Sequence, residues 1–403
     1  MQSVDIVIIG AGAAGLMAGI WAGRSNPQRR IVLLDGAKKL GAKILVAGGG
    51  RCNVTHHQVD ASAFAGSSRN AIKKVLRRFD VSQTKRFFKE QGVTLKREET
   101  GKLFPTTDSS KTVLHALLKA ARAAQVEIRH PQRVETVEKM GDRFVVRGAW
   151  GAIHADKVVL ATGGRSIPKS GSDGHGYRIA QGLGHRLTER IFPALVPLTL
   201  PKKHFLCQLS GITLPTTLEL WSGSGKRLQM FSNSTLLTHF GLSGPSVLDM
   251  SRYYLAALSA DAKTTLTLNL IPQHTPTTFE QALLGLGKKQ PITLLRQYLP
   301  ERMARMLLAQ TGIDGVQMTR KQRKQLVELA TRYPLPISGN RGYNYAEVTA
   351  GGVPLSELNL TTMESRLCPN LYFAGEICDV DGRIGGFNFQ WAWSSGYVVG
   401  VSV

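Results

Sequence analysis

The chain has 403 residues, of which 42% are hydrophobic and 20% are charged. This composition excludes a mini-protein and a wholly disordered chain, and the length predicts two or three packed units. Lysine and arginine total 51 against 28 aspartate and glutamate, which gives a net charge of +23. Such an excess is typical of proteins that meet a polyanion, either a nucleic acid or an anionic membrane surface.

No stretch of the sequence favours membrane insertion. The most apolar stretch, residues 4–22, is interrupted by four glycines and has no basic segment before it. The four cysteines are scattered without a Cys-x-x-Cys pair, and no group of residues shows metal-ligand spacing. We therefore expect a soluble, cytoplasmic protein with no disulfide framework, no metal and no membrane partner.

The N-terminal residues have the order strand, glycine turn, helix, strand. The apolar run Val4–Ile9 precedes the glycine-rich segment Gly10–Gly15, and a helical stretch, Leu16–Arg24, follows. A second apolar run, Ile31–Leu34, ends in Asp35. This order is typical of a Rossmann-like unit that binds a dinucleotide.

The glycine turn and the acid have separate roles in such a unit. Gly10 permits the turn, Gly12 lets a pyrophosphate approach the backbone, and Gly15 allows close helix packing. The helix N-terminus presents free N–H groups to the phosphates, and Asp35 can accept hydrogen bonds from an adenosine ribose. Either a flavin or a nicotinamide dinucleotide fits this pattern. The predicted contacts are Gly10, Gly12, Ala13, Ala14, Gly15 and Asp35.

Beyond this unit, the pattern predicts helices at 71–92 and 112–124, and strands at 126–129, 133–139, 143–147 and 157–161. Prolines interrupt the pattern near residue 193. Residues 195–275 then alternate in short runs typical of antiparallel β structure, and residues 279–332 are helical and basic. Strand-like runs at 345–349 and 371–374 follow. We expect residues 1–192 and 341–403 to form one domain around an inserted domain, residues 193–340.

Two basic regions stand out, one at residues 69–97 and the other at 288–324. A run of charge is often only a solvated face, but two such runs in a chain of net charge +23 favour RNA or DNA as a partner. The candidate RNA-binding residues are Lys73, Lys74, Arg77, Arg78, Lys321, Arg323 and Lys324.

The loop Gly48–Asn53 brings flexible backbone N–H groups, a guanidinium and a thiol together, which suits contact with a phosphate or a flavin. Because Arg51 is adjacent, we expect a lowered pKa for the Cys52 thiol; the alternative is that Cys52 is a small buried hydrophobe. His239 is a second candidate catalytic group, although a structural histidine that closes a turn is the favoured interpretation.

Six segments carry a resemblance to a known family. They are Lys43–Asn53, with its GGGRCN motif, Ala161–Gly164, Thr238–Pro245, Val348–Gly352, Tyr372–Glu376 and Asp379–Arg383. With them, the chain resembles the BaiN/RdsA family of FAD-dependent oxidoreductases along essentially its whole length. The resemblance implies an α/β fold in which a Rossmann-like FAD-binding domain carries an inserted domain, β-barrel-like with added helices.

The resemblance also implies roles for residues outside the glycine turn. Gly375 and Glu376 would bind the ribityl chain, and Gly386, Phe387 and Asn388 would form a helix N-terminus facing the isoalloxazine. There its partial positive charge would stabilise the reduced, anionic flavin. The other implied cofactor contacts are Lys43, Gly49, Gly50, Arg51, Thr162 and Gly163.

The family is associated with reduction of conjugated carbon–carbon double bonds, in steroid-like enones or in a uridine of 23S ribosomal RNA. NADH or NADPH would reduce FAD, N5 would deliver hydride to C6 of an unstacked uracil, and Cys52 would protonate C5. The net charge favours the RNA substrate. The alternatives are a reductase of a small conjugated molecule and a flavin- and folate-dependent tRNA-modifying enzyme.

Overall fold

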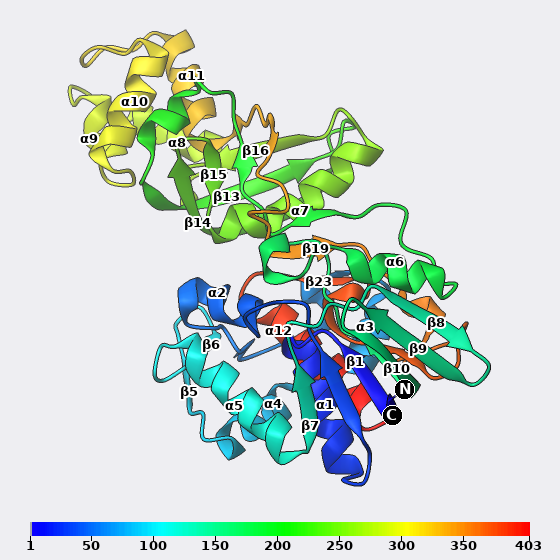
Figure 1. Cartoon of the computed structure of the whole chain (residues 1–403). Coiled ribbons are helices and arrows are strands. Elements are labelled where there is room, and N and C mark those ends of the chain that lie inside the picture. Colours follow the sequence, from blue (N-terminus) through cyan, green and yellow to red (C-terminus); the bar gives the residue numbers. More distant parts are fainter. Residues whose placement is uncertain (1) are drawn as a thin grey trace. The chain divides into compact units, whose positions relative to one another are not determined.

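The structure is a computed structural model that describes residues 2–403, and these divide into two units. One unit joins the chain up to Pro193 with Glu347–Val403, and the other is Ala194–Ala346. In Figure 1 the blue and red ends of the chain accordingly belong to the same unit. The inserted unit thus ends at Ala346, whereas the sequence predicted its end at residue 340.

Five parallel strands form the centre of the first unit, in the order β22-β10-β1-β2-β7. Their continuous apolar runs are buried, as expected for a parallel sheet that is covered on both faces. A hairpin and two short strands extend this sheet. The bounds are β1 Gln2–Ile9, β2 Ile31–Leu34, β7 Val126–Arg129, β8 Thr136–Met140, β9 Arg143–Gly148, β10 Gly151–Leu160, β20 Leu358–Asn359, β21 Glu364–Ser365 and β22 Leu371–Phe373.

The register of this sheet aligns the ends of its strands. Ile9 pairs with Leu34 on one side and with Leu160 on the other. Phe373 in turn pairs with Leu160. The residues that follow these four strands therefore lie along one carboxyl edge of the sheet, where ligands of doubly wound α/β folds bind.

Helix α1 (Ala13–Ser25) packs closely against the C-terminal helix α12 (Phe387–Gly400). A Cβ at Gly396 would lie 2.6 Å from the carbonyl oxygen of Ala14, and one at Gly400 would lie 2.6 Å from that of Ala18. The remaining helices of this unit are α2 Ala42–Gly50, α3 Arg69–Leu76, α4 Val81–Glu90, α5 Ser110–Ala123 and α6 His175–Gly182.

The single helix predicted at 71–92 is wrong, because the structure has two helices there. Helix α3 ends at Leu76, and Asp80 starts α4 with a capping box, in which its carboxylate accepts a hydrogen bond from the Gln83 N–H. The side chain of Gln83 accepts one from the Asp80 N–H in return. Reciprocal caps of this kind fix a helix start inside an otherwise continuous helical pattern.

Short strands complete the first unit. Three of them form one small sheet, in the order β3-β6-β5, and β4 pairs with β23. The bounds are β3 Thr55–His56, β4 Phe64–Gly66, β5 Leu95–Arg97, β6 Lys102–Pro105, β11 Phe192–Ala194, β19 Val348–Ala350 and β23 Val380–Gly382.

The inserted unit contains a seven-stranded antiparallel sheet in the order β17-β16-β13-β14-β15-β12-β18. Strands β17 and β18 do not pair with each other in this order, so the sheet predicted as barrel-like is open at these edges. The bounds are β12 Leu198–Thr199, β13 Thr213–Trp221, β14 Arg227–Thr238, β15 Gly241–Ser243, β16 Thr265–Asn269, β17 Tyr333–Pro334 and β18 Gly339–Asn340.

The helices of the inserted unit are α7 Pro245–Ala260, α8 Pro276–Leu284, α9 Pro291–Leu295, α10 Glu301–Thr311 and α11 Arg320–Thr331. Sequence reasoning missed α7, which packs against β13 and β14 within the stretch predicted to be purely β. Among residues 2–403, no helix combines the length and the apolar character needed to cross a bilayer.

Candidate cofactor and active site

The glycine turn between β1 and α1 has the backbone that the sequence predicted. Gly10 has a φ of +106°, and a Cβ there would lie 2.5 Å from the carbonyl oxygen of Ala161. A Cβ at Gly15 would lie 1.9 Å from the carbonyl oxygen of Gly10. A Cβ at Gly12 would meet no atom within 4 Å, so there is open space beside the turn for a ligand.

The first turn of α1 has features that favour binding of an anion. Gly12 is its N-cap, no side chain caps it, and it contains no acidic residue. Asp35 closes the other side: its Oδ2 accepts a hydrogen bond from the Ala11 N–H and its Oδ1 one from the Ala37 N–H, both at 2.7 Å. Because each carboxylate oxygen can accept a second hydrogen bond, Asp35 can orient the turn and still bind ribose hydroxyls.

Two buried hydroxyls lie next to this turn without a partner. The Oγ1 of Thr162 and the Oγ of Ser172 are buried and form no hydrogen bond within residues 2–403. A Cβ at Gly163, which has a φ of +74°, would come 2.8 Å from the Ser172 Oγ, and one at Gly176 would come 1.8 Å from the Thr162 Oγ1. Unpaired buried hydroxyls are costly, and FAD would supply the polar partners they lack. Sequence reasoning proposed Thr162 and Gly163 but missed Ser172, which carries no distinctive motif.

An ion pair joins two of the predicted cofactor residues. Lys43 Nζ lies 2.5 Å from Glu376 Oε2, and the other oxygen of Glu376 accepts a hydrogen bond from the Thr349 N–H at 2.9 Å. Gly375 has a φ of +78°, and a Cβ there would lie 2.7 Å from that of Ala14 in α1. Gly375 therefore lies beside the first turn of α1, and Lys43 is joined to the same segment through Glu376.

The glycine loop at the end of α2 has an unusual backbone. Gly48, Gly49 and Gly50 have φ values of +58°, +68° and +88°, and a Cβ at Gly49 would meet nothing within 4 Å. Arg51 pairs with Glu98, with 2.6 Å between Nη1 and Oε1, its guanidinium lies 4.0 Å from the Phe104 ring centroid, and its Nε donates to the Gly48 carbonyl oxygen at 3.5 Å. These contacts account for Arg51 without a cofactor.

Cys52 lies in the hydrophobic core and is 0% exposed. Burial raises the pKa of its thiol far above the ordinary value, so the prediction that Arg51 lowers this pKa is wrong. A thiol that is both inaccessible and weakly acidic is poorly suited to protonate a substrate, and the structure favours the small buried hydrophobe. The adjacent Asn53, which sequence reasoning did not select, has a buried Oδ1 with no partner in residues 2–403.

Helix α12 starts at a glycine that packs against β3, where a Cβ at Gly386 would lie 2.5 Å from the backbone carbonyl carbon of Thr55. Gly386 is the N-cap with a φ of +96°, and the first turn has neither a side-chain cap nor an acidic residue. The Asn388 side chain is occupied within the protein: it accepts from the Gly382 N–H and donates to the Gly382 carbonyl oxygen, both at 2.8 Å. The Phe387 ring stacks on His56, with centroids 5.0 Å apart. Any contact of this helix start with a flavin is therefore made by backbone N–H groups.

The remaining predicted residues are at the surface. His239 is exposed in the turn between β14 and β15, and this turn is closed by the Thr238 hydroxyl, which donates to the Gly241 carbonyl oxygen, rather than by His239. Arg323 pairs with Glu280 at 3.1 Å, so it is already neutralised. The other basic candidates are exposed, and within residues 2–403 none forms an ion pair: Lys73, Lys74, Arg77, Arg78, Lys321 and Lys324.

Comparisons with known proteins show what the whole chain is similar to. The chain is 34% identical to the ribosomal RNA dihydrouridine synthase of Escherichia coli K12, over 98% of this chain and 97% of that protein. It is 32% identical to the 3-dehydro-bile acid delta(4,6)-reductase of Clostridium scindens, over 98% of each. In fold it is similar to the FrdA subunit of E. coli quinol fumarate reductase, with a TM-score of 0.51 and 16% identity, over 100% of this chain and 70% of that one.

Fold, site and relatives together define an FAD-dependent oxidoreductase built on a Rossmann-type domain. The chain belongs to the family described as HI0933-like protein Rossmann domain, whose model matches residues 4–402. This confirms the predicted family resemblance and the predicted α/β fold with a Rossmann-like FAD-binding domain.

Proposed function

We propose that this enzyme works in the cytoplasm and uses NADH or NADPH to reduce a uridine of 23S ribosomal RNA to dihydrouridine. The observation that carries the proposal is the set of exposed, unpaired cations on α3 and α4 in a chain of net charge +23. A phosphate-rich substrate gains from such a surface, whereas an apolar enone does not. The name of the E. coli relative supports the same substrate.

Different residues of the chain would bind the two halves of FAD, the adenosine half and the flavin half. The N-terminus of α1 and Asp35 would bind the pyrophosphate and the adenosine ribose. Glu376, paired with Lys43, would accept hydrogen bonds from ribityl hydroxyls, and the first turn of α12 would stabilise negative charge on the ring system. When bound and reduced by NADH or NADPH, FAD would supply the hydride for the double bond. The basic face of α3 and α4 would bind the RNA phosphates.

A second candidate is reduction of a small conjugated molecule, favoured by the 32% identity to the bile acid reductase. The two functions would share every FAD contact, so only the substrate separates them. The basic side chains of α3 and α4 would favour binding of anionic RNA, but they would not favour binding of an apolar, steroid-like enone.

Anaerobic reoxidation of the reduced enzyme tests the choice. The enzyme is first reduced with NADH or NADPH and then mixed with deproteinised ribosomal RNA or with a steroid enone, while flavin absorbance is followed. We expect RNA to reoxidise the flavin and to acquire dihydrouridine. Reoxidation by the enone but not by RNA would establish the second function instead.

A further inference from the structure

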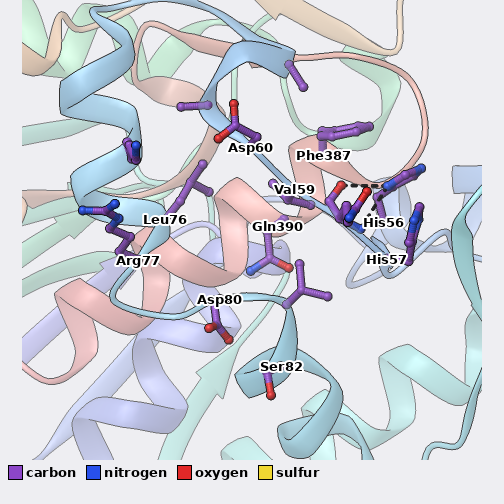
Figure 2. Close-up of a pocket in the computed structure, with 15 residues that line it drawn as sticks. His56, His57, Val59, Asp60, Leu76, Arg77, Asp80, Ser82, Phe387 and Gln390 are labelled. Atoms are coloured by element: carbon purple, nitrogen blue, oxygen red, sulfur yellow. Dashed lines mark hydrogen bonds between the residues drawn. The ribbon is translucent and has the colours of Figure 1, made fainter.

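A pocket of about 630 Å³ lies within the first unit. It is formed by β3 and the segment after it, by α3, by the start of α4, and by α12 (Figure 2). In Figure 2, Arg77 on one side and His56 with His57 on the other flank Phe387 and Gln390 of α12. Its volume is in the range of small-molecule sites, about 300–1,000 Å³.

The floor of the pocket is rigid. Gln390 is fully buried, and its Oε1 accepts hydrogen bonds from the hydroxyls of Thr55 and Thr84. Its Nε2 donates to the Phe79 carbonyl oxygen at 2.9 Å. Because this amide is already satisfied within the protein, the floor offers shape rather than polar contacts. Next to it, Phe387 and the His56 ring form a stacked aromatic wall.

The rim carries both cations and hydrogen-bond acceptors. Lys73 lies in α3 and Arg77 is the residue that caps its C-terminal end; both are exposed and form no ion pair within residues 2–403. Asp60 and Asp80 also line the pocket. Hydrogen bonds from Ser62 lower the pKa of Asp60, and the charge of Lys73 nearby lowers it further, so this carboxylate is ionised at neutral pH as an ordinary aspartate is.

We propose that this pocket binds one nucleotide of a single-stranded RNA segment, with its phosphate at Lys73 and Arg77 and its base between the aromatic wall and the carboxylates. Single-stranded RNA is recognised in this way, by stacking of splayed bases on aromatic rings and by hydrogen bonds to base edges. The inference rests on the proposed function and deepens it, since it names where the strand is anchored beside the start of α12.

The surroundings of the pocket favour an RNA strand over a free dinucleotide. Exposed lysine and arginine side chains continue beyond the pocket, along α3, the turn after it and α4. They are Arg69, Lys74, Arg78, Lys85, Arg86 and Lys89. A nicotinamide dinucleotide brings only a compact pyrophosphate, whereas a strand brings a row of phosphates that such a surface can neutralise. The carboxylates on the rim can accept hydrogen bonds from base N–H groups.

Two pairs of variants of the FAD-loaded enzyme test the pocket. Ser82 lines it and is exposed, so Ser82→Glu adds a negative charge there, and Ser82→Gln is the control of similar size. An acid near the start of α4 suits the helix dipole, so the variant should fold. Lys73→Ala/Arg77→Ala removes two cations from the rim, and Lys85→Ala/Lys89→Ala removes two from outside it.

The first readout is binding of a fluorescent single-stranded RNA, measured by anisotropy. We expect Ser82→Glu and the rim pair to weaken binding about tenfold or more, and each control several times less, because one base-stacking contact typically contributes a tenfold to hundredfold factor. The second readout is photo-crosslinking of RNA that contains 4-thiouridine. Crosslinked peptides should map to residues 56–63 or 80–82.

The outcomes separate this proposal from the proposed function. If Ser82→Glu and Ser82→Gln bound RNA equally well and crosslinks mapped only outside residues 56–63 and 80–82, the proposal that the pocket binds RNA would be overturned. A raised KM for NADH in Ser82→Glu with unchanged RNA binding would assign the pocket to the nicotinamide cofactor and would also overturn it. The parent enzyme is assayed for dihydrouridine in parallel: RNA bound in the pocket but never reduced would overturn the proposed function and retain the pocket.

Discussion

At the scale of single residues, burial decides what Cys52 can do. It follows the three glycines of the loop, where its identity suggested chemistry, yet its side chain is 0% exposed. We predict that Cys52→Ala retains FAD and forms dihydrouridine within about twofold of the parent rate, because no proton passes through a buried thiol. The free energy of unfolding should fall by about 1 kcal/mol, the cost of lost packing. A rate loss of a hundredfold in single-turnover assays would restore Cys52 as the general acid.

Asp35 is the residue that most directly links the fold to FAD. We predict that Asp35→Ala loses most of its bound FAD, because the variant lacks the ribose acceptor and leaves the Ala11 and Ala37 N–H groups unpaired. Flavin released on denaturation, per mole of protein, measures this. Asp5→Ala is the matched control, since half-buried Asp5 also accepts a hydrogen bond from a backbone N–H, that of Arg30, at 2.7 Å. Full FAD in Asp35→Ala would remove this residue from the site.

His185 gives the protein a predictable sensitivity to acid. Its ring is buried between Glu357, 2.8 Å from Nδ1, and Ser365, 2.7 Å from Nε2. Burial lowers the pKa of His185 below its ordinary 6.5, despite the opposing effect of Glu357. The folded state therefore holds His185 neutral, and the unfolded state takes up the proton first as the pH falls. The contribution of His185 to the free energy of unfolding should be fully present above pH 6.5. It should decline as the pH falls below 6.5, by up to about 1.4 kcal/mol per pH unit.

Urea unfolding at pH 7.5 and at pH 5.5 tests this linkage. His185→Gln removes the titrating group, so its midpoint should fall less on acidification than that of the parent. His239→Gln, at an exposed position, should retain the parent's acid sensitivity. An identical acid response in His185→Gln and the parent would show that other groups cause the loss.

At the scale of elements, the close packing of α1 and α12 depends on the absence of a side chain. We predict that Gly396→Ala destabilises the protein by about 1–3 kcal/mol, because its Cβ would lie 2.6 Å from the Ala14 carbonyl oxygen and would push the helices apart. Gly182→Ala is the control at the end of α6, where a Cβ meets nothing within 4 Å, and it should be neutral or stabilising. Thermal unfolding of both variants decides the point.

Some elements of the fold could be predicted from the sequence alone, and others could not. Local patterns predicted β1, β2 and the glycine turn, because strand, turn and helix signals there lie within 35 residues. The ion pair of Arg51 with Glu98 could not be predicted, since it joins residues 47 positions apart through the folded hairpin of β5 and β6. Helix α7 was missed because it lies within a stretch rich in strand-like runs, where tertiary packing decides the helix.

At the scale of the whole molecule, the charge of +23 predicts how substrate binding responds to salt. RNA affinity should fall steeply with salt, with a log–log slope of about −0.7 per neutralised phosphate of a single strand. Reversing Arg77, Arg78, Lys321 and Lys324 to Glu should abolish RNA turnover and leave NADH oxidation intact, since none of the four is among the predicted FAD contacts. Anisotropy titrations at several salt concentrations and parallel turnover assays measure both effects. If that variant turned over RNA at the parent rate, these residues would be only a solvated surface with no role in RNA binding.

The central claim concerns the substrate, and nucleoside mass spectrometry of ribosomal RNA tests it most directly. RNA from cells that lack this protein is compared with RNA from the same cells complemented with the parent or with Asp35→Ala. The account predicts that a dihydrouridine in 23S RNA is absent without the protein, returns with the parent, and stays strongly reduced with Asp35→Ala. An unchanged dihydrouridine content in cells without the protein would contradict it.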